Sequence, residues 1–252
     1  MATLEALYEA ILAAPDEELP RLAYSDAVAT SDVARGEFIK LQIVLARWRK
    51  AHENPSARPQ TSARAAVLRD QHGKRWAAPI NALVDGWSFY RGFVELVELD
   101  AGRFLASAPQ LFRTAPILHL DLTNVKAHAT ALFASPHLAR IQSLSLTRNE
   151  LGDAEIAQLA KSPYLGGLRW LSLASNEIGE AGIEALAATD RLRALAYVNL
   201  DFNPGPNPVP EHVDEYGGET ALAKVLQAKF GLRRWMSSEN RHEWPPERDA
   251  VA

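Results

Sequence analysis

Apolar and polar residues alternate in two segments of the chain that are separated by a helical pattern. Residues 141–151 (IQSLSLTRNEL) and 168–178 (LRWLSLASNEI) carry apolar side chains at their first, fourth, sixth and eleventh positions, and asparagine at the ninth. The two copies are 27 residues apart, measured from Leu146 to Leu173. This alternation predicts short strands with one buried face, and each asparagine can hydrogen-bond to backbone groups where its strand ends.

This spacing, L-x-x-L-x-L-x-x-N-x-L, resembles the leucine-rich repeat. One unit cannot bury its apolar face alone, so the resemblance implies stacked coils that share one core. The second strand leucine recurs at intervals of 23, 24, 27 and 27 residues, at Leu99, Leu122, Leu146, Leu173 and Leu200. The corresponding asparagine position holds Gly102, Val125, Asn149, Asn176 and Asn203, so only the last three coils keep the amide.

The segments between the predicted strands have a helical period and are rich in alanine, as in residues 153–161 (DAEIAQLAK). A strand followed by a full helix at this repeat length resembles the ribonuclease-inhibitor class of leucine-rich repeats. We therefore expect an α/β leucine-rich repeat solenoid of five coils over residues 86–235, with parallel strands inside and helices outside. We expect it to be capped by a helix near its C-terminal end and, at its start, by Trp87, Phe89, Tyr90 and Phe93.

Helical spacing of apolar residues predicts an N-terminal helical domain over residues 1–50. Its helices are expected at residues 3–14, from Pro20 onward, and at about residues 36–49. Residues 51–85 are expected to form a loop, mobile over residues 51–62, and a linking helix. Residues 236–252 are expected to form a loose C-terminal tail.

Residues 11–26 (ILAAPDEELPRLAYSD) and 35–42 (RGEFIKLQ) resemble the short repeat-companion domain, which precedes repeats in many bacterial proteins. The tryptophan and the acidic pair that usually follow the aspartate of this motif are replaced here. The resemblance implies a repeat-bearing bacterial protein and supplies no catalytic residue. Four charged residues of this region are expected to form ion pairs that lock helix ends, with a binding role as the alternative: Arg21, Asp26, Arg35 and Glu37.

Composition is that of an ordinary globular protein, with 47% apolar and 23% charged residues among 252. The absence of cysteine excludes a disulfide framework, thiol catalysis and thiolate metal sites. The longest apolar runs are too short to span a bilayer, and the N-terminal residues lack the pattern of a secretion signal. We therefore expect a cytoplasmic protein that does not associate with membranes.

Charge is unevenly distributed along the chain. The net charge is −4, but residues 34–80 hold ten Lys or Arg against three acidic residues, a net +7 that leaves −11 for the remainder. Such asymmetry can steer an acidic partner, or it can mark a solvated helical face. The second interpretation is favoured.

Standard catalytic signatures are absent from the sequence. It contains no G-x-S-x-G, no H-E-x-x-H, no P-loop and no G-x-G-x-x-G between a strand and a helix. The seven histidines are scattered: His242 lacks a second histidine at helical spacing, and His212, with Asp214 and Glu215, lies in a proline-rich loop. We therefore expect a protein that is not an enzyme, with no catalytic residue, no metal and no cofactor.

Residues beside the strand leucines point away from the predicted core and form the concave face of the sheet. They include an aromatic group with polar neighbours, namely Trp170, Tyr197, Phe202, Arg148, Asp201 and Asn199, and an acidic group with one histidine, namely Glu98, Asp100, Asp121 and His119. Exposed tryptophan and tyrosine are typical anchors of protein-binding surfaces. The alternative is that Trp170 and Tyr197 cover each other or lie beneath the proline-rich loop that follows residue 203.

We expect recognition of a protein or peptide through this concave face, without catalysis. Its small serine and threonine side chains suit an extended partner better than a small molecule. A role as an accessory or substrate-presenting subunit of an enzyme system is one alternative. Nucleic-acid binding by the basic helices of residues 35–75 is another, but the overall acidity and the lack of an aromatic–basic stacking pattern weigh against it.

Overall fold

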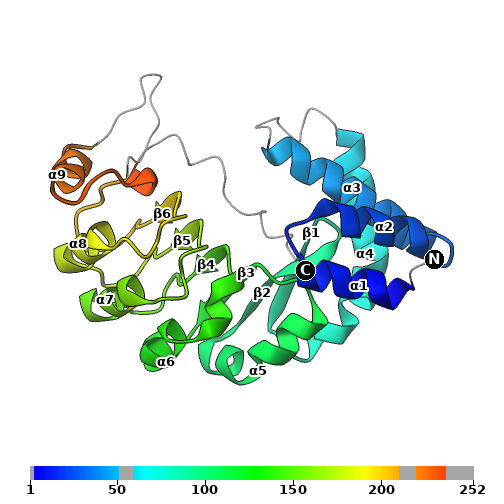
Figure 1. Cartoon of the computed structure of the whole chain (residues 1–252), viewed down its shortest axis with the longest axis horizontal. Helices are drawn as coiled ribbons and strands as arrows, with labels where there is room; N and C mark the ends of the chain where they lie inside the picture. Colours follow the sequence, from blue (N-terminus) through cyan, green and yellow to red (C-terminus); the bar gives the residue numbers. More distant parts are fainter. Residues whose placement is uncertain (1–2, 51–58, 210–219, 237–252) are drawn as a thin grey trace. The chain divides into compact units, whose positions relative to one another are not determined.

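The fold is mixed α/β, in a computed structural model that describes residues 3–50, 59–209 and 220–236 (Figure 1). The N-terminal part holds α1 (Leu4–Ala13), α2 (Glu18–Val28), α3 (Val33–Lys50), α4 (Pro59–Asn81), β1 (Gly86–Tyr90) and β2 (Phe93–Asp100). The remaining elements are α5 (Ala101–Thr114), β3 (His119–Thr123), η2 (Lys126–His128), α6 (Ala129–Phe133), η3 (Pro136–Arg140), β4 (Ser143–Ser145), α7 (Asp153–Lys161), β5 (Trp170–Ser172), α8 (Glu180–Ala188), β6 (Tyr197–Asn199), α9 (Ala221–Phe230) and η4 (Arg234–Met236). None of the helices in the described ranges has the length and apolar character needed to cross a membrane.

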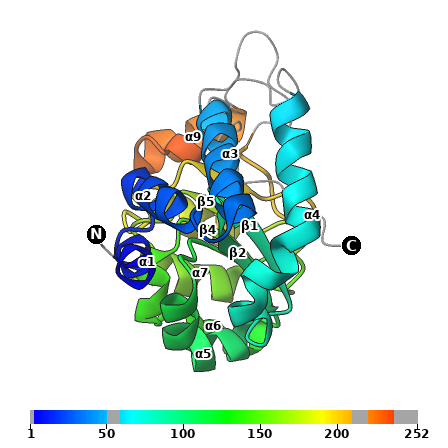
Figure 2. The same ribbon diagram turned by 90° about the vertical axis from the view of Figure 1, so that its right-hand side faces the viewer.

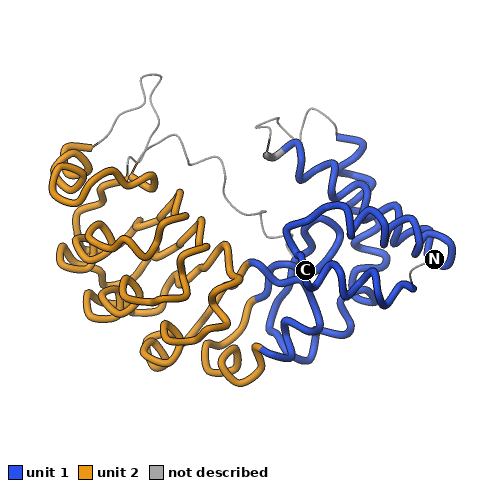
Figure 3. Tube along the Cα trace, viewed as in Figure 1, with its two compact units in different colours: residues 1–97, 109–118, 246–252 blue, residues 98–108, 119–245 orange. Residues whose placement is uncertain are grey.

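The strands of the described residues form a six-stranded sheet in chain order, β1-β2-β3-β4-β5-β6. From β3 to β6 neighbouring strands are parallel, and their register aligns Leu120, Leu144, Leu171 and Val198. The chain divides into two compact units (Figure 3). Within the described ranges, unit 1 comprises residues up to 97 and 109–118, and unit 2 comprises residues 98–108 and those from 119 onward.

The core of unit 2 is built from the alternating leucines of its strands. The predicted inward residues are at most 2% exposed: Leu144, Leu146, Leu171, Leu173, Val198 and Leu200. Both their burial and the parallel arrangement of their strands are confirmed. Ile156 of α7 and Ile183 of α8 are also buried, and Figure 1 shows α6, α7 and α8 along one side of β4, β5 and β6. The residues between the leucines therefore point away from these helices.

Asparagine side chains bridge successive strand–helix units of unit 2. The Oδ1 of Asn176 accepts hydrogen bonds from the backbone N–H groups of Asn149, at 2.9 Å, and Leu151, at 3.0 Å. Its Nδ2 donates to the carbonyl oxygen of Leu146 at 3.0 Å. Asn149 bonds in the same way to the N–H of Val125 and the carbonyl of Leu122, and Asn203 to the N–H of Ile178 and the carbonyl of Leu173. The amides thus satisfy backbone groups that the ends of the strands would otherwise bury unpaired.

In unit 1 the N-terminal helices cover the aromatic side chains of β1 and β2. Tyr8 of α1 and Tyr24 of α2 pack on Phe93, with ring centroids 6.0 and 5.5 Å from its ring. Phe38 of α3 packs edge-on against Phe89 at 5.2 Å. Figure 2 shows α3 and α4, which pack against each other, beside β1. Phe89 and Phe93, two of the four aromatic residues expected to form a cap, are therefore themselves covered by helices.

Residues 86–100 form a hairpin, whereas the sequence was expected to lead into a single strand. Arg91 and Gly92 connect β1 to β2 with positive φ angles of 49° and 86°. A two-residue connection of this kind is the type I′ turn that joins antiparallel strands. A Cβ on Gly92 would lie 2.6 Å from the side chain of Ile39, so the close approach of α3 also requires glycine here. The Arg-Gly pair between two apolar runs is the sequence signal for this turn.

The linking helix is longer than predicted and the loop before it is shorter. α4 begins at Pro59, and proline fits the first helical turn because its missing N–H has no intrahelical role there. Residues 59–62 are therefore helical, while residues 51–58 lie outside the described residues. Met236, expected in the tail, belongs to η4 and is buried, and residues 237–252 lie outside the described residues.

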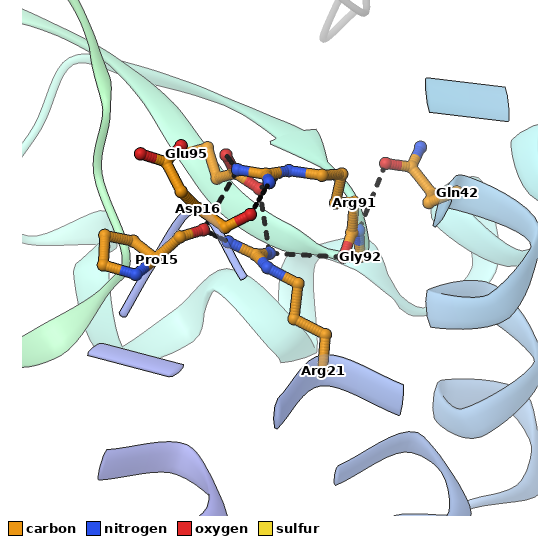
Figure 4. A network of polar contacts seen from close by, with 7 residues as sticks. All are labelled: Pro15, Asp16, Arg21, Gln42, Arg91, Gly92 and Glu95. Carbon is orange, nitrogen blue, oxygen red and sulfur yellow. Dashed lines mark hydrogen bonds and ion pairs between the residues drawn. The ribbon is translucent and has the colours of Figure 1, made fainter. Parts of the chain in front are cut away.

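A buried charge network holds the hairpin to α2 and to the residues before it (Figure 4). Glu95 of β2 forms ion pairs with Arg21 of α2, at 2.8 Å, and with Arg91 of the turn, at 2.7 Å. Both arginines also donate hydrogen bonds to the carbonyl oxygen of Pro15, at 2.6 and 3.0 Å. Burial raises the pKa of Glu95, and the two guanidinium groups oppose that effect by favouring its carboxylate. Each charge in this site depends on the others for compensation.

Leu171→Ala tests the core of unit 2. Leu171 is fully buried, so the substitution is expected to lower the free energy of unfolding by about 2–5 kcal/mol through lost burial and the cavity left behind. Urea unfolding followed by circular dichroism measures the change. Leu232→Ala is the matched control, because Leu232 belongs to the same unit and is 74% exposed. Similar losses for both variants would contradict the assigned core.

Glu95→Gln tests the buried network of unit 1. The amide keeps the shape of the side chain but leaves the buried guanidinium of Arg21 without its counter-ion. We expect a loss of about 3–5 kcal/mol in the free energy of unfolding. The control is Glu98→Gln on the same strand, where the side chain is half-buried and the expected change is below about 1 kcal/mol. Equal changes would show that the network does not stabilise unit 1.

Candidate binding face

The predicted recognition residues lie in unit 2 and follow the register of its strands. The row before the buried leucines contains His119, Ser143, Trp170 and Tyr197, one on each strand from β3 to β6. Trp170 and Tyr197 are half-buried, whereas His119 is 4% exposed and Ser143 is 6% exposed. The expectation that His119 belongs to an open face is therefore wrong, because its neighbours enclose it.

Trp170 contributes to this enclosure. Its ring centroid lies 6.4 Å from that of His119, with 49° between the ring planes. Ser143 stands between the two in register, and its short side chain allows the rings to meet. The indole Nε1 is buried, with no hydrogen-bond partner among the described residues. Part of Trp170 therefore packs internally, and only the remainder of the ring is available to another molecule.

The middle strands carry short hydroxyl side chains in the next two rows. The hydroxyls of Thr147 and Ser172 are hydrogen-bonded at 2.8 Å, and the hydroxyl of Ser145 donates to Thr147 Oγ1 at 3.4 Å. In register, Asp121 of β3 aligns with Ser145, and Asn199 of β6 aligns with Ser172. A strip of linked hydroxyls therefore lies between an acid on one side and an amide on the other.

Asp100, predicted to belong to the acidic group, caps a helix. Its Oδ1 accepts the N–H groups of Gly102, at 2.7 Å, and Arg103, at 3.1 Å, in the first turn of α5. Its Oδ2 accepts a hydrogen bond from Asn124 Nδ2 at 3.0 Å. The bond from Asn124 has the largest effect on the pKa of Asp100, which is lowered, so the cap stays ionised at neutral pH.

Asn199 and Asp201, predicted as neighbours of the aromatic group, order the turn after β6. Asn199 Oδ1 accepts the backbone N–H of Asp201 at 2.8 Å. Asp201 Oδ1 accepts a hydrogen bond from Asn207 Nδ2 at 3.3 Å. Both side chains are half-buried, so they can hold the turn and still present an edge to a partner.

A row of left-handed residues follows the strands, and the sequence analysis did not anticipate it. The turns after β3 to β6 share a residue with positive φ at one position, namely Asn124 (54°), Arg148 (58°), Ser175 (54°) and Phe202 (58°), and the turn after β4 has a second one, Glu150 (55°). Asparagine tolerates this conformation, whereas it is strained for a bulky side chain. Phe202 is in addition 86% exposed. Neither internal packing nor backbone preference favours phenylalanine at this position.

Phe202 occupies a different position along the strands from Trp170 and Tyr197. Tyr197 begins β6, whereas Phe202 lies in the turn beyond the end of that strand, five residues later. An extended chain advances roughly 3.3 Å per residue, which separates the two positions by up to about 16 Å. Arg148 is exposed in the same row as Phe202. The candidate residues therefore fall into two groups: Trp170 and Tyr197 at the start of the strands, and Phe202 with Arg148 beyond their ends.

The charged residues singled out in the N-terminal helices are separate in the structure. Asp26 pairs with Lys40, and Glu37 pairs with Arg64, each at 2.6 Å. Arg21 belongs to the buried network with Glu95. These three contacts agree with the structural role expected for ion pairs, but they do not bring the four residues together.

Arg35 departs from that expectation because its guanidinium forms no ion pair with an acid among the described residues. Its guanidinium carbon lies 4.9 Å from the ring centroid of Trp76 and 5.0 Å from that of Phe93. The side chain is 8% exposed, and its Nη1 has no hydrogen-bond partner among the described residues. Burial lowers the pKa of Arg35 to about 10, so it stays charged at neutral pH. Aromatic faces thus take the place of a carboxylate around this cation.

Comparison with known proteins adds no site residue. No protein-family model matches the chain, and no curated protein sequence matches it. Over residues 3–50, 59–209 and 220–236, no group of three or more His, Asp or Glu side chains is placed to hold a metal ion. The candidate face therefore rests on its own geometry.

Phe202→Asn tests whether Phe202 is strained. Asparagine at the same backbone angle is expected to raise the free energy of unfolding by about 1 kcal/mol, because it tolerates the left-handed conformation and removes an exposed aromatic ring. The measurement is the urea midpoint of the variant against the natural chain. Ser175→Asn is the comparison variant: it places asparagine at the equivalent position of the preceding turn, where φ is 54°, without removing an aromatic ring, and so separates relief of backbone strain from loss of the ring. A loss of stability in Phe202→Asn would show that the ring packs internally.

Proposed function

We propose that residues 86–235 form a leucine-rich repeat solenoid of the ribonuclease-inhibitor-like class, and that residues 1–50 are a repeat-companion domain of a bacterial protein. The parallel register from β3 to β6 supports the solenoid, as do the buried leucines that repeat along the chain. The bridging amides of Asn149, Asn176 and Asn203 support it further, because each binds backbone groups of the preceding turn. Helices α6 to α8 correspond to the outer layer of such coils (Figure 1).

We propose that this solenoid recognises a protein or peptide through the outward face of its sheet, without catalysis of its own. The observation that carries the proposal is Phe202, an aromatic ring 86% exposed on a backbone with φ of 58°. A residue that is both strained and exposed is unfavourable for folding, so contact with another molecule is the role that its surroundings favour. Large aromatic side chains are also the most frequent energetic anchors of protein interfaces.

The shape of the face favours an extended partner. Its middle strands carry Ser145, Thr147 and Ser172, whose hydroxyls bond to one another, and its longer side chains stand at the edges. Four parallel strands about 4.8 Å apart give a width of roughly 14 Å between the first and the last. A peptide segment crossing these strands can contact both Trp170 and Phe202.

Nucleic-acid binding by the basic helices has less support. Several of their cations are already paired with acids: Lys40 with Asp26, Arg47 with Glu18, Arg64 with Glu37 and Arg75 with Asp32. Arg35 is buried among aromatic rings. A nucleic-acid surface needs cations that are free to meet phosphates, and these pairs reduce the number available.

Peptide selection tests the proposed recognition. A random peptide library is selected on the immobilised full-length protein, and the enriched peptides are synthesised and titrated by fluorescence anisotropy. Phe202→Asn and Trp170→Ala are each expected to weaken binding about thirtyfold, the effect of losing an interface anchor. Phe202→Asn should do so while its stability rises, whereas Trp170→Ala should also lose stability because part of its ring packs on His119.

Two further variants complete this experiment. Ser175→Asn, which alters the neighbouring turn of the same edge, is the matched control and should leave the affinity unchanged. Arg47→Glu reverses an exposed charge of the basic helices and should also leave it unchanged. Peptides that bind Phe202→Asn and Trp170→Ala as tightly as the natural chain would place recognition elsewhere. A large loss of peptide affinity in Arg47→Glu would instead indicate binding by the basic helices.

A further inference from the structure

The outward positions of the sheet in unit 2 carry acids but no lysine or arginine. Taking the three residues beside the buried leucines on each strand from β2 to β6, the charged side chains are Glu98, Asp100, Asp121 and Asp201, and no Lys or Arg occurs among them. Glu98, Asp100, Asp121 and Asp201 are all half-buried, so their charge reaches the surface of the face. An array of one sign on a sheet produces a field that attracts the opposite charge.

The acids stand at both margins of the hydroxyl strip. Asp121 aligns with Ser145 on the β3 side, and Asp201 follows Asn199 on the β6 side. Asp100 remains ionised at neutral pH because hydrogen bonds, chiefly from Asn124, lower its pKa. It therefore adds to the negative field although its oxygens already cap a helix. Short hydroxyl side chains between the margins leave the centre uncharged.

Two aromatic rings lie on the same outward side of the sheet, at the start of β5 and β6. Trp170 and Tyr197 are neighbours in register and are half-buried, so each ring has a portion that another molecule can reach. Carboxylates beside aromatic faces are the surroundings that guanidinium and ammonium groups prefer, since the first supply ion pairs and the second supply cation–π contact. Arg35 of unit 1 shows that this chain holds a guanidinium group against aromatic rings elsewhere.

We propose that the partner of this face is a basic peptide segment, whose arginine or lysine side chains meet Asp121 and the neighbouring acids and stack on the rings of Trp170 and Tyr197. The inference rests on the proposed recognition function and specifies the chemistry of its ligand. Arg148, the exposed cation beyond the ends of the strands, opposes such a partner and limits how far it extends toward Phe202.

The C-terminal segment of the same chain is the main competing occupant. Residues 237–252 (SSENRHEWPPERDAVA) follow η4 directly and lie outside the described residues. They contain four acidic residues and two arginines, a net charge of −2. That charge has the same sign as the face, so electrostatics favour a basic segment from another molecule.

Synthetic peptides test the charge of the partner on the full-length protein. The probes alternate glycine with arginine, with glutamate or with serine at equal length, and a fourth probe has the sequence of residues 237–252. We expect only the arginine peptide to bind, with an affinity that falls as salt is added. Glu98→Gln and Asp121→Asn should each weaken it about two- to fivefold, and Arg148→Glu should strengthen it by a similar factor.

Glu180→Gln is the control for net charge, because Glu180 is an exposed residue of α8 rather than of the sheet. It should leave the affinity for the arginine peptide unchanged. An equal loss in Glu180→Gln and Asp121→Asn would mean that the peptide senses only the total charge of the protein, and would overturn the proposal. Tighter binding of the glutamate peptide, or of the peptide with the sequence of residues 237–252, would also overturn it.

The outcomes separate this inference from the proposed function. Library-selected peptides that depend on Trp170 and Phe202 but are neutral or acidic would overturn the basic partner and leave recognition by the face intact. Selected peptides that ignore both aromatic residues would overturn the recognition face itself. Selected peptides that are rich in arginine or lysine and weakened by Asp121→Asn support both.

Discussion

The burial of Glu95 between two arginines is the constraint on which the N-terminal unit depends. A carboxylate removed from water is costly unless opposite charges and hydrogen bonds replace its hydration. Arg21 comes from α2 and Arg91 from the hairpin turn, so Glu95 is compensated only when helix and hairpin are in place together. The carbonyl of Pro15, which accepts from both arginines, brings the residues before α2 into the same arrangement (Figure 4).

The same principle, that buried polar groups need partners, organises the second unit through amides rather than charges. Asn149, Asn176 and Asn203 each accept from and donate to the backbone of the preceding turn. The residue before each of them takes a left-handed conformation, as Arg148, Ser175 and Phe202 do. Because this geometry points the preceding side chain outward, a structural requirement of the turns creates an exposed row beside the sheet.

The proposed recognition face consists of outward side chains of this scaffold, some of which also have a role in the fold. Some predicted site residues are occupied by the fold: Asp100 caps α5, and Asn199 and Asp201 order a turn. Asp100 and Asp201 would still attract the proposed partner, since a hydrogen-bonded carboxylate keeps its field. Phe202 is different, because its surroundings give it no structural task. The proposed face thus combines acids that have roles in the fold with one exposed aromatic ring, for which we propose a role in contact.

Local pattern was sufficient to predict the inward leucines and the bridging role of the asparagines, whereas the parallel strands were expected from the resemblance to leucine-rich repeats. A period of two residues specifies which side chains share a face, whatever the rest of the chain does. The row of left-handed residues was harder to predict from the sequence, because its members share no side-chain type. The same holds for the Arg21–Glu95 pair, whose members are far apart in the sequence and resemble surface charges until they are brought together.

Only the tertiary structure decided which outward residues are open. His119 and Trp170 occupy equivalent positions of the pattern, yet His119 is enclosed, because Ser143 between them is small enough for the two rings to meet. Arg35 lies among aromatic rings from several elements instead of in the predicted ion pair. The sequence by itself determined to which face of the sheet each side chain points, because that depends on one strand alone. Exposure depends on the sizes of side chains on neighbouring strands and helices, and only folding brings those together.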